Sequence, residues 1–265
     1  TEVLVLERLS FRRFLALKLS DRVPDATTVW LFRDTATRMG LVEELFRQFD
    51  LQLTVKGIEA RKGSIIDASI VEAPRQKISR EEKKEIEEKG TVQKWSEAKR
   101  RQKDTDAQWA KKNSRSFLGF KNHVCVDAEN KIICKFAVTD ASVHDGQLTQ
   151  LLLDSTNSSG KVYTDSAYLS RTTLLYMDCM GFIPKICHKG RKGRPLTERE
   201  KQGNRTKSRV RARVEHVFGM LKMAAGDPLL RSIGLDKARV KIGLQNLTYS
   251  MRRLATLLKA IPCTV

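Results

Sequence analysis

The order of strands and helices between residues 64 and 186 restricts the fold of this chain more than any other feature of its sequence. Apolar residues change here from helical to strand spacing, and they predict five strands and two helices in the order β-β-β-α-β-α-β. The predicted strands are SIIDASIVEA (64–73), the two halves of SFLGFKNHVCVDAENKIICKFAVTDAS (116–142), GKVYTDSAYL (160–169) and FIPKI (182–186). The predicted helices are DGQLTQLLLD (145–154) and SRTTLLYMDCMG (170–181). Such an order requires a mixed sheet with helices on its faces.

The first 60 residues have a different pattern, and we expect them to form a small all-helical domain that precedes the sheet and serves DNA binding, dimerisation or both. Apolar residues recur at three- and four-residue steps in three segments, residues 6–17, 25–40 and 41–50. Ser10 and Asp25 are the predicted N-caps, and Gly40 is predicted to end the second of these helices. We expect Trp30 to lie in the core of this domain rather than to stack on a nucleic-acid base.

Residues 61–265 form the second predicted domain, which two charged segments interrupt. Residues 74–115 are polar throughout, so we expect an exposed excursion with one solvated helix near residues 79–89. The basic segment 185–213 follows the last strand, and helices are predicted at residues 205–224 and 236–260.

A three-stranded meander followed by alternating helices and strands is the layout of a ribonuclease H-like fold. We therefore predict an α/β core with a mixed five-stranded sheet and flanking helices. In this layout the first and fourth strands lie side by side. Asp67, in the first strand, and Asp165, at the end of the fourth, then face a common point. The helix after the fifth strand can bring Glu215 to the same point.

Three carboxylates at one point are suited to holding metal ions. Hard oxygen ligands select Mg²⁺ or Mn²⁺ over zinc, and two such ions about 3.5–4 Å apart can promote an in-line phosphoryl displacement. A structural role is equally open for Asp67, because an acid in an apolar strand also bonds to backbone or to arginine. For Asp165, at a strand end, a role as a turn or cap residue is open too.

The segment RVRARVEHVFGMLK (209–222) places basic residues on both sides of its acid. At about 100° per residue, Arg211, Glu215 and Lys222 share one face of a helix. Arg211 and Lys222 are therefore candidates for holding DNA phosphates beside the metals. The alternative is an ordinary surface pair of Arg211 with Glu215, worth about 0.3–0.5 kcal/mol.

The formal charge of +19 indicates a polyanionic partner, and nucleic acid is the first candidate. Between Lys185 and Arg213 the sequence has twelve Lys or Arg and two Glu, so this stretch carries +10. Its residues Arg191, Lys192 and Arg194 are candidate phosphate contacts, although a solvated basic linker with no specific target has the same composition.

A second candidate DNA contact lies in the charged excursion. Trp109 stands beside Lys111 and Lys112, so the indole can stack on an extruded base while the lysines hold the neighbouring phosphates. A packing role for Trp109 is the alternative.

Other polar residues compete for the predicted site. Asp140, His144 and Asp145 follow the third strand, and Asp145 is predicted to cap the next helix. His123, inside a strand, is predicted to be structural. The five cysteines include no CxxC pair, which argues against a disulfide framework and a zinc ribbon.

These segments resemble the DDE transposases of bacterial insertion sequences, specifically the family named after insertion sequence number five. The resemblance runs through SFRRFLALKLSDRVPDATTVWLFR, GSIIDASIVEAPRQK, DTDAQWAKKNSRSFLGFKNHVCVDAENKII, AVTDASVHDGQ, VYTDSAY, RARVEHVFGMLK and GLDKARVKIGLQNLTYSMRRL, which is nearly the whole chain. It implies catalytic, metal-binding roles for Asp67, Asp165 and Glu215. Relatives carry the signature Tyr-x2-Arg-x3-Glu-x6-Lys; Arg211, Glu215 and Lys222 match it, whereas Ser208 stands in the tyrosine's place.

The resemblance implies an enzyme that cuts the ends of its own element and joins the freed 3′-hydroxyls to target DNA, with Mg²⁺ or Mn²⁺ and two ions per site. Its partner is then double-stranded DNA, as terminal inverted repeats and target. We expect a second copy in the DNA complex, because two element ends require two coordinated active sites. No apolar run approaches the roughly 20 residues needed to cross a bilayer, and we expect a bacterial cytoplasmic protein that associates with the nucleoid. A nuclease or resolvase without strand joining, and a silent transposase-derived DNA-binding protein, remain open.

Overall fold

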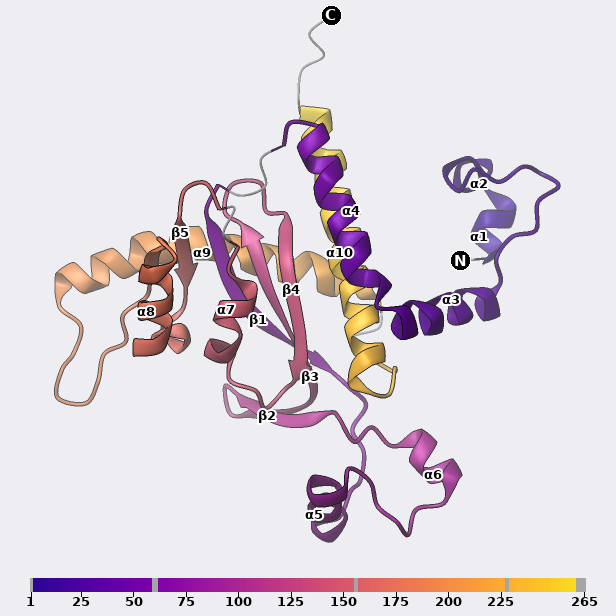
Figure 1. Cartoon of the computed structure of the whole chain (residues 1–265), viewed down its shortest axis with the longest axis horizontal. Coiled ribbons are helices and arrows are strands. Elements are labelled where there is room, and N and C mark those ends of the chain that lie inside the picture. Colours follow the sequence, from indigo (N-terminus) through magenta and orange to yellow (C-terminus); the bar gives the residue numbers. More distant parts are fainter. Residues whose placement is uncertain (1, 59–61, 155–156, 227–228, 261–265) are drawn as a thin grey trace, which may run out of the picture.

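A curled six-stranded sheet lies at the centre of the computed structural model, with helices on both faces (Figure 1). The structure describes residues 2–58, 62–154, 157–226 and 229–260. Strands β1 (Ser64–Glu72), β3 (Arg115–Asp127) and β4 (Ile133–Asp140) form an antiparallel meander. On the other side of β1, the strands β5 (Lys161–Thr164) and β6 (Ile183–Ile186) continue the sheet in parallel. This is the predicted ribonuclease H-like order, and all five predicted strands are confirmed.

The prediction of five strands is nevertheless one too few, because the charged excursion contributes β2 (Gln108–Lys112). This strand pairs with the first residues of β3, from Arg115 to Gly119. Gly119 pairs with β1 as well as β2, and it has a φ of 152°. A Cβ at Gly119 would lie 2.2 Å from the backbone oxygen of Val71, so only glycine allows β1 and β3 to approach here.

The rest of the excursion folds outside the sheet as α5 (Arg80–Lys89) and α6 (Glu97–Gln102). The helix predicted near residues 79–89 is confirmed; Ser79 and Glu82 form a capping box at its start. The segment is not exposed throughout, since Val92 and Trp95 are buried and the Trp95 indole N–H donates to Glu82 over 2.7 Å.

The described residues before the sheet form four helices: α1 (Glu2–Glu7), α2 (Leu9–Phe14), α3 (Ala26–Met39) and α4 (Leu41–Val55). The Asp25 carboxylate accepts the Thr28 N–H over 2.7 Å, which confirms the predicted N-cap of α3. Gly40, with a φ of 59°, ends α3 as predicted. Two predictions are wrong: Ser10 lies inside α2 instead of capping it, and Trp30 is 55% exposed instead of buried.

Helix α10 (Leu235–Ala260) joins the first helices to the sheet. Its Leu247 packs with Phe49 and Leu53 of α4 and with Ile132 beside β4. Where α10 crosses α4 at Gly243, a Cβ would lie 2.5 Å from the Val42 side chain, so the two helices meet as closely as a glycine allows. The predicted domain boundary at residue 60 lies outside the described residues.

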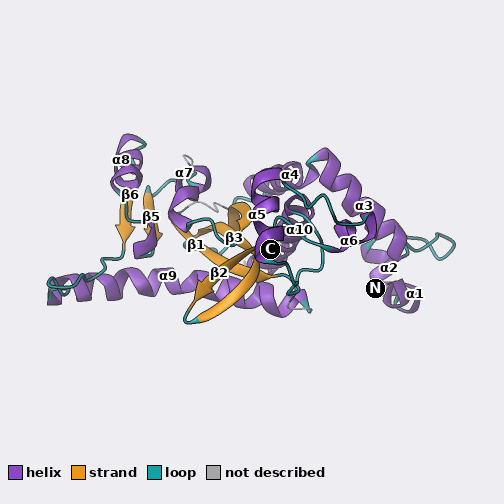
Figure 2. Cartoon of the chain, turned by 90° about the horizontal axis from the view of Figure 1, so that it is seen from below, coloured by secondary structure: helices purple, strands orange, loops and turns teal. Residues whose placement is uncertain are grey.

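Helix α9 (Glu198–Ala225) covers one face of the sheet along its length, and the short helices α7 (Thr149–Leu152) and α8 (Arg171–Cys179) cover the other (Figure 2). Alternate residues of β1 serve the two faces: Ile65 packs with Val214 and Val217 of α9, whereas Ile66 packs with Met177 of α8. Helix α9 begins seven residues before the predicted start at 205, at a capping box that Thr197 and Glu200 form.

No helix within the described ranges is both long and apolar enough to cross a membrane. The cysteines in those ranges, Cys125, Cys134, Cys179 and Cys187, carry free thiols, and Cys263 lies outside them.

Candidate active site

Asp67, Asp165 and Glu215 line one cavity of about 640 Å³ between the sheet and α9. Each comes from a different element: Asp67 from β1, Asp165 from the residue after β5, and Glu215 from the middle of α9. Because Ile65 faces α9 and strand side chains alternate, Asp67 faces α9 as well. The fold thus gathers three acids that are 50 to 148 residues apart in the sequence.

The side chain of Asp165 also has the alternative role considered for it. Its carboxylate accepts the N–H of Ala167 over 2.8 Å and caps the 3₁₀ turn η2 (Ser166–Tyr168). One carboxylate oxygen therefore orients the side chain while the residue lines the cavity. Asp165 can therefore cap this turn and line the cavity at the same time.

Burial and neighbouring charges perturb the carboxylate of Asp67. Burial raises its pKa, and the nearby Asp165 charge raises it further, while the Ala68 N–H and Arg211 act in the opposite direction. The Ala68 N–H lies 2.8 Å from one carboxylate oxygen, and Arg211 Nε lies 3.5 Å from the other. Arg211 Nε is buried, and it has no hydrogen-bond partner among the described residues. The structure thus shows an arginine beside the acid, at a distance longer than a hydrogen bond.

Basic side chains surround the acids on two sides. Arg211 and Lys222 line the cavity from α9, which places them with Glu215 on one helical face, as the spacing predicts. Lys111 and Lys112 line it from β2, the strand that the sequence pattern missed. The pairing of β2 with β3 explains how a polar segment of the excursion reaches the acids.

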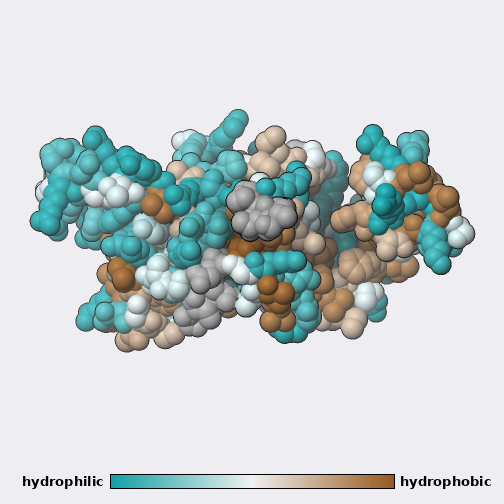
Figure 3. All heavy atoms as spheres, turned by 90° about the horizontal axis from the view of Figure 1, so that it is seen from above, coloured by the Kyte–Doolittle hydropathy of each residue, from teal (hydrophilic) through white to brown (hydrophobic). Residues whose placement is uncertain are grey.

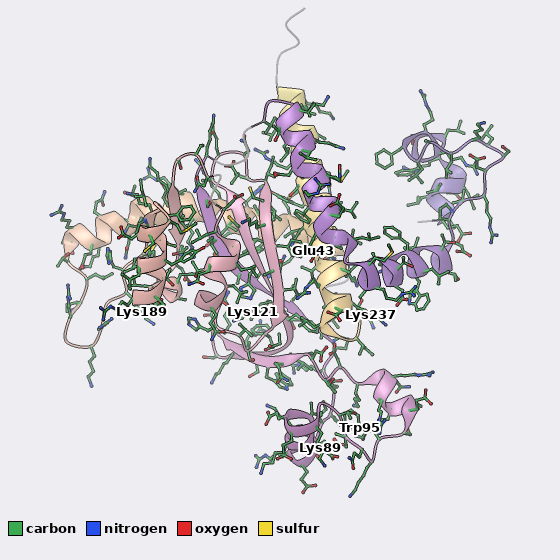
Figure 4. The ribbon with its side chains drawn as sticks, viewed as in Figure 1. Glu43, Lys89, Trp95, Lys121, Lys189 and Lys237 are labelled. Atoms are coloured by element: carbon green, nitrogen blue, oxygen red, sulfur yellow. The ribbon has the colours of Figure 1, made fainter. Side chains whose placement is uncertain are left out.

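Trp109, on the same strand, is 45% exposed and is not among the residues that line the cavity. Its ring is therefore neither packed in a core nor beside the acids. Arg191, Lys192 and Arg194 also lie outside the cavity, exposed in the loop before α9, where Arg191 and Arg194 bond to each other through their backbones. Figure 4 labels Lys189 in this loop and Lys121 in the central sheet, and the two lie apart in this view.

A fourth acid, Asp145, lines the same cavity. It was predicted to be a helix cap, and that prediction is wrong: Asp145 is the first residue of the 3₁₀ turn η1 (Asp145–Leu148), and His144 occupies the cap position. Instead its carboxylate accepts a hydrogen bond from Lys121 Nζ over 2.8 Å, and the same ammonium donates to Val143 O over 2.6 Å. Sequence reasoning missed Lys121, whose signal is a lysine within an otherwise apolar strand.

Two buried side chains flank these acids. Tyr168 is fully buried, and its hydroxyl has no hydrogen-bond partner in the described part of the chain. Burial and the charges of Asp67, Asp145 and Asp165 raise the pKa of Tyr168, so the phenol is neutral. His123 is also fully buried, and its Nε2 lies 2.9 Å from Thr139 Oγ1. Burial lowers the pKa of His123 to about 4, which fits the predicted structural role.

The cavity has the donor chemistry for a hard divalent cation, but its side chains are not drawn together as ligands. Among the described residues, no three acids, histidines or cysteines lie close enough to hold a metal ion. Asp67 and Asp165 do lie close enough that the charge of one raises the pKa of the other, a repulsion that a cation relieves. Carboxylate oxygens alone, without sulfur or imidazole, fit Mg²⁺ or Mn²⁺.

Ser208, in the place of the signature tyrosine, does not line the cavity. Its hydroxyl lies 3.8 Å from the sulfur of Cys187, the residue that follows β6. The contact therefore joins α9 to the sheet. Ser208 therefore does not replace any phosphate contact that the signature tyrosine makes in relatives.

Comparison with known proteins identifies the family of this chain. The model of the family "Transposase DDE domain" matches residues 59–251, and that of "Transposase domain (DUF772)" matches residues 1–35. The transposase for insertion sequence element IS1106 of Neisseria meningitidis serogroup B is 30% identical over 233 residues, which cover 87% of this chain and 77% of the relative. No solved structure matches the chain. The chain belongs to the DDE transposase family of bacterial insertion sequences.

Proposed function

We propose that this protein is a metal-dependent DNA strand transferase. It cuts the ends of its own insertion sequence and directs the freed 3′-hydroxyls to attack target DNA. The observation that carries the proposal is the cavity itself, which acids from β1, the end of β5 and α9 line together with basic side chains of β2 and α9.

In this proposal Asp67, Asp165 and Glu215 hold divalent cations, Mg²⁺ or Mn²⁺, as a pair. When bound, two such ions activate the attacking oxygen and stabilise the leaving oxygen of an in-line displacement. The carboxylates fix the position of the cations relative to the sheet, because two of the three acids are anchored by backbone N–H groups, those of Ala68 and Ala167.

The basic residues then hold the DNA. Arg211, Lys222, Lys111 and Lys112 stand on both sides of the acids, so the scissile phosphate and its neighbours can contact them together. A phosphate that contacts Arg211 draws this side chain away from Asp67, and the Asp67 carboxylate can then bind the cation. DNA binding and metal binding therefore support each other at this point.

Outside the cavity, the exposed Arg191, Lys192 and Arg194 provide further phosphate contacts, and Trp109 offers its open ring to a base. The DNA partners in this proposal are the terminal inverted repeats and the target. Two element ends require two active sites, so the DNA complex contains a homodimer.

The experiment that tests the function uses duplexes with the ends of the element, a target plasmid and either Mg²⁺ or EDTA. We expect cleavage at the 3′ ends and a covalent product that joins end to target, both only with metal. A second reaction supplies ends that already carry a free 3′-hydroxyl. If these ends are never joined although intact ends are cut, the protein is a nuclease or resolvase. If duplexes are bound and never cut, it is a silent DNA-binding protein.

A further inference from the structure

The first three helices expose an unusual amount of apolar surface. Of the 27 large apolar side chains that are exposed in the described part of the chain, 13 lie between Val3 and Met39. The most exposed of these 13 side chains are Phe14 at 82% and Leu19 at 77%. Figure 3 shows apolar residues gathered at the end of the molecule that these helices form. We refer to residues 2–39, helices α1 to α3, as the arm.

The charge of the arm argues against DNA as its partner. The arm contains seven basic and five acidic residues, so it carries only +2 in a chain of +19. Arg12 is buried, and its guanidinium donates to the backbone oxygens of Lys18 and Asp21, so it stabilises the turn after α2. An exposed apolar surface with balanced charge fits a protein partner.

An apolar groove lies on the body of the protein, between α9 and α10. It has a volume of about 460 Å³, and its apolar lining comes from Met220, Leu221, Ala224, Leu244 and Tyr249. Basic side chains line it as well, namely Arg33, Lys131, Lys241, Arg252 and Arg253. Arg33 Nε is buried and has no hydrogen-bond partner among the described residues. The groove is therefore suited to an apolar segment that carries acidic groups.

Helix α1 is such a segment. Its sequence EVLVLE has a glutamate at each end, no basic residue, and the exposed apolar side chains Val3, Leu4 and Leu6 between them. Helix α2 continues the apolar surface with Leu9, Phe11 and Phe14, but it also carries Arg12 and Arg13, so the charge match to the groove comes from α1 alone. The apolar residues match the groove lining, and Glu2 and Glu7 match the basic side chains at it.

The arm leaves the body beside the groove and does not turn back into it. Arg33 of α3 lines the groove, whereas α1 and α2 lie at the far end of α3, away from α9 and α10 (Figures 1 and 2). Two copies related by a two-fold axis bring each arm to the groove of the other, because the same two surfaces meet twice in such a dimer. We propose that α1 and α2 of one copy dock in the α9–α10 groove of a second copy, and the reverse.

Disulfide trapping tests this exchange in the full chain without DNA or metal, so its outcome is independent of the proposed cleavage chemistry. The background carries Cys179→Ser, which removes the thiol that is exposed among the described residues, and Cys263→Ser, which removes the cysteine outside them. In this background one chain carries Leu6→Cys and another carries Ala224→Cys. Leu6 is 55% exposed and Ala224 is exposed, so both substitutions leave the core intact. A mixture of the two chains is expected to form a disulfide-linked pair under mild oxidation.

The control replaces Ala224→Cys by Met223→Cys, one residue away, which is 81% exposed and does not line the groove. This mixture is expected to give at least tenfold less of the linked pair. The chain that carries both Leu6→Cys and Ala224→Cys tests the alternative: a bridge within one chain shows that the arm folds back on its own body, and this overturns the proposal.

Sedimentation provides the second measurement. The wild-type chain is expected to be a dimer without DNA. Ala224→Glu, which puts an acid into the groove that the acidic helix enters, is expected to raise the dimer dissociation constant at least tenfold, while Met223→Glu leaves it unchanged. A monomeric wild type overturns the proposal, and so does a dimer that Ala224→Glu and Met223→Glu affect equally.

Discussion

Asp67→Asn removes a charge that the fold holds at a cost, and its effect on stability has a definite sign. The substitution keeps the size of the side chain and removes the ionised carboxylate. Because the folded-state pKa of Asp67 lies above its ordinary value of 3.8, the folded protein binds this proton more tightly than the unfolded chain. The wild type therefore loses stability as the pH rises from 3.8 through the folded-state pKa. The asparagine variant has no such loss.

The size of the effect follows from the net shift of the Asp67 pKa. This net shift already includes the attraction to Arg211, a pair whose side chains are 23% and 16% exposed. Each pKa unit of the shift corresponds to about 1.4 kcal/mol in favour of the variant above this pH window. We expect the metal-free variant to melt at the same temperature as the wild type or higher, where a gain of 1 kcal/mol raises the Tm by about 2–4 °C. The difference should disappear below pH 3.8.

With metal bound, we expect the wild type to melt at a higher temperature than the variant. The assay is thermal unfolding in EDTA and in a Mn²⁺ series. At a concentration 100 times the dissociation constant, a cation stabilises the wild type by about 2.7 kcal/mol, or roughly 5–10 °C, and the variant by much less. DNA binding in EDTA should be retained, and cleavage lost. Asp67 has no place in the site if the asparagine variant melts lower in EDTA, gains as much from Mn²⁺ as the wild type, and cuts DNA.

Three further predictions concern the DNA contacts. Neutralising Arg191, Lys192 and Arg194 together should weaken binding to all sequences and reduce the slope of log affinity against log salt by up to about three units; loss confined to the cognate sequence contradicts a phosphate role. Lys222→Ala should slow cleavage by about 10–100-fold, and saturating DNA should restore only part of the rate, since full restoration means that affinity alone was lost. Trp109→Ala should weaken binding to single-stranded end DNA by about 1–3 kcal/mol with an unchanged Tm, and a lower Tm with unchanged binding identifies a packing residue instead.

Elements with strong local signals were predictable from the sequence. The alternation in residues 64–73 and in the hairpin of β3 and β4 places apolar side chains on buried faces, and the structure confirms these strands. Asp25 and Gly40 cap the two ends of α3 as predicted, because a cap depends only on the backbone within a few residues. Such signals need no knowledge of the distant parts of the chain.

The missed elements depend on distant partners. Strand β2 has the sequence QWAKK and no apolar face, and it exists because the first residues of β3 offer a free edge. Trp30 fits the apolar pattern of α3, but the pattern indicates only that a side chain prefers burial, and this chain leaves that face uncovered. Helix α9 starts early because the Thr197 and Glu200 capping box lies within a polar run that has no apolar period.

The candidate site also combines features that the sequence predicts with features that depend on distant parts of the chain. The convergence of Asp67 and Asp165 follows from topology alone, since β1 and β5 are neighbours in the predicted layout. The shared face of Arg211 and Lys222 follows from helix geometry. The ion pair of Lys121 with Asp145 was not predictable, because it joins a strand to a turn 24 residues away.

The most direct test of the three-carboxylate account is the cleavage and strand-transfer rate of Glu215→Gln across a Mg²⁺ series. Glutamine keeps the size and helix propensity of Glu215 and removes the anionic oxygen that the account assigns to metal. The account predicts that cleavage and joining are lost at every Mg²⁺ concentration at which the variant stays folded, with DNA binding retained. Near-normal cleavage by this variant, with a stability change of at most about 1 kcal/mol, would mean that Glu215 forms only a surface pair with Arg211, and it would contradict the mechanism.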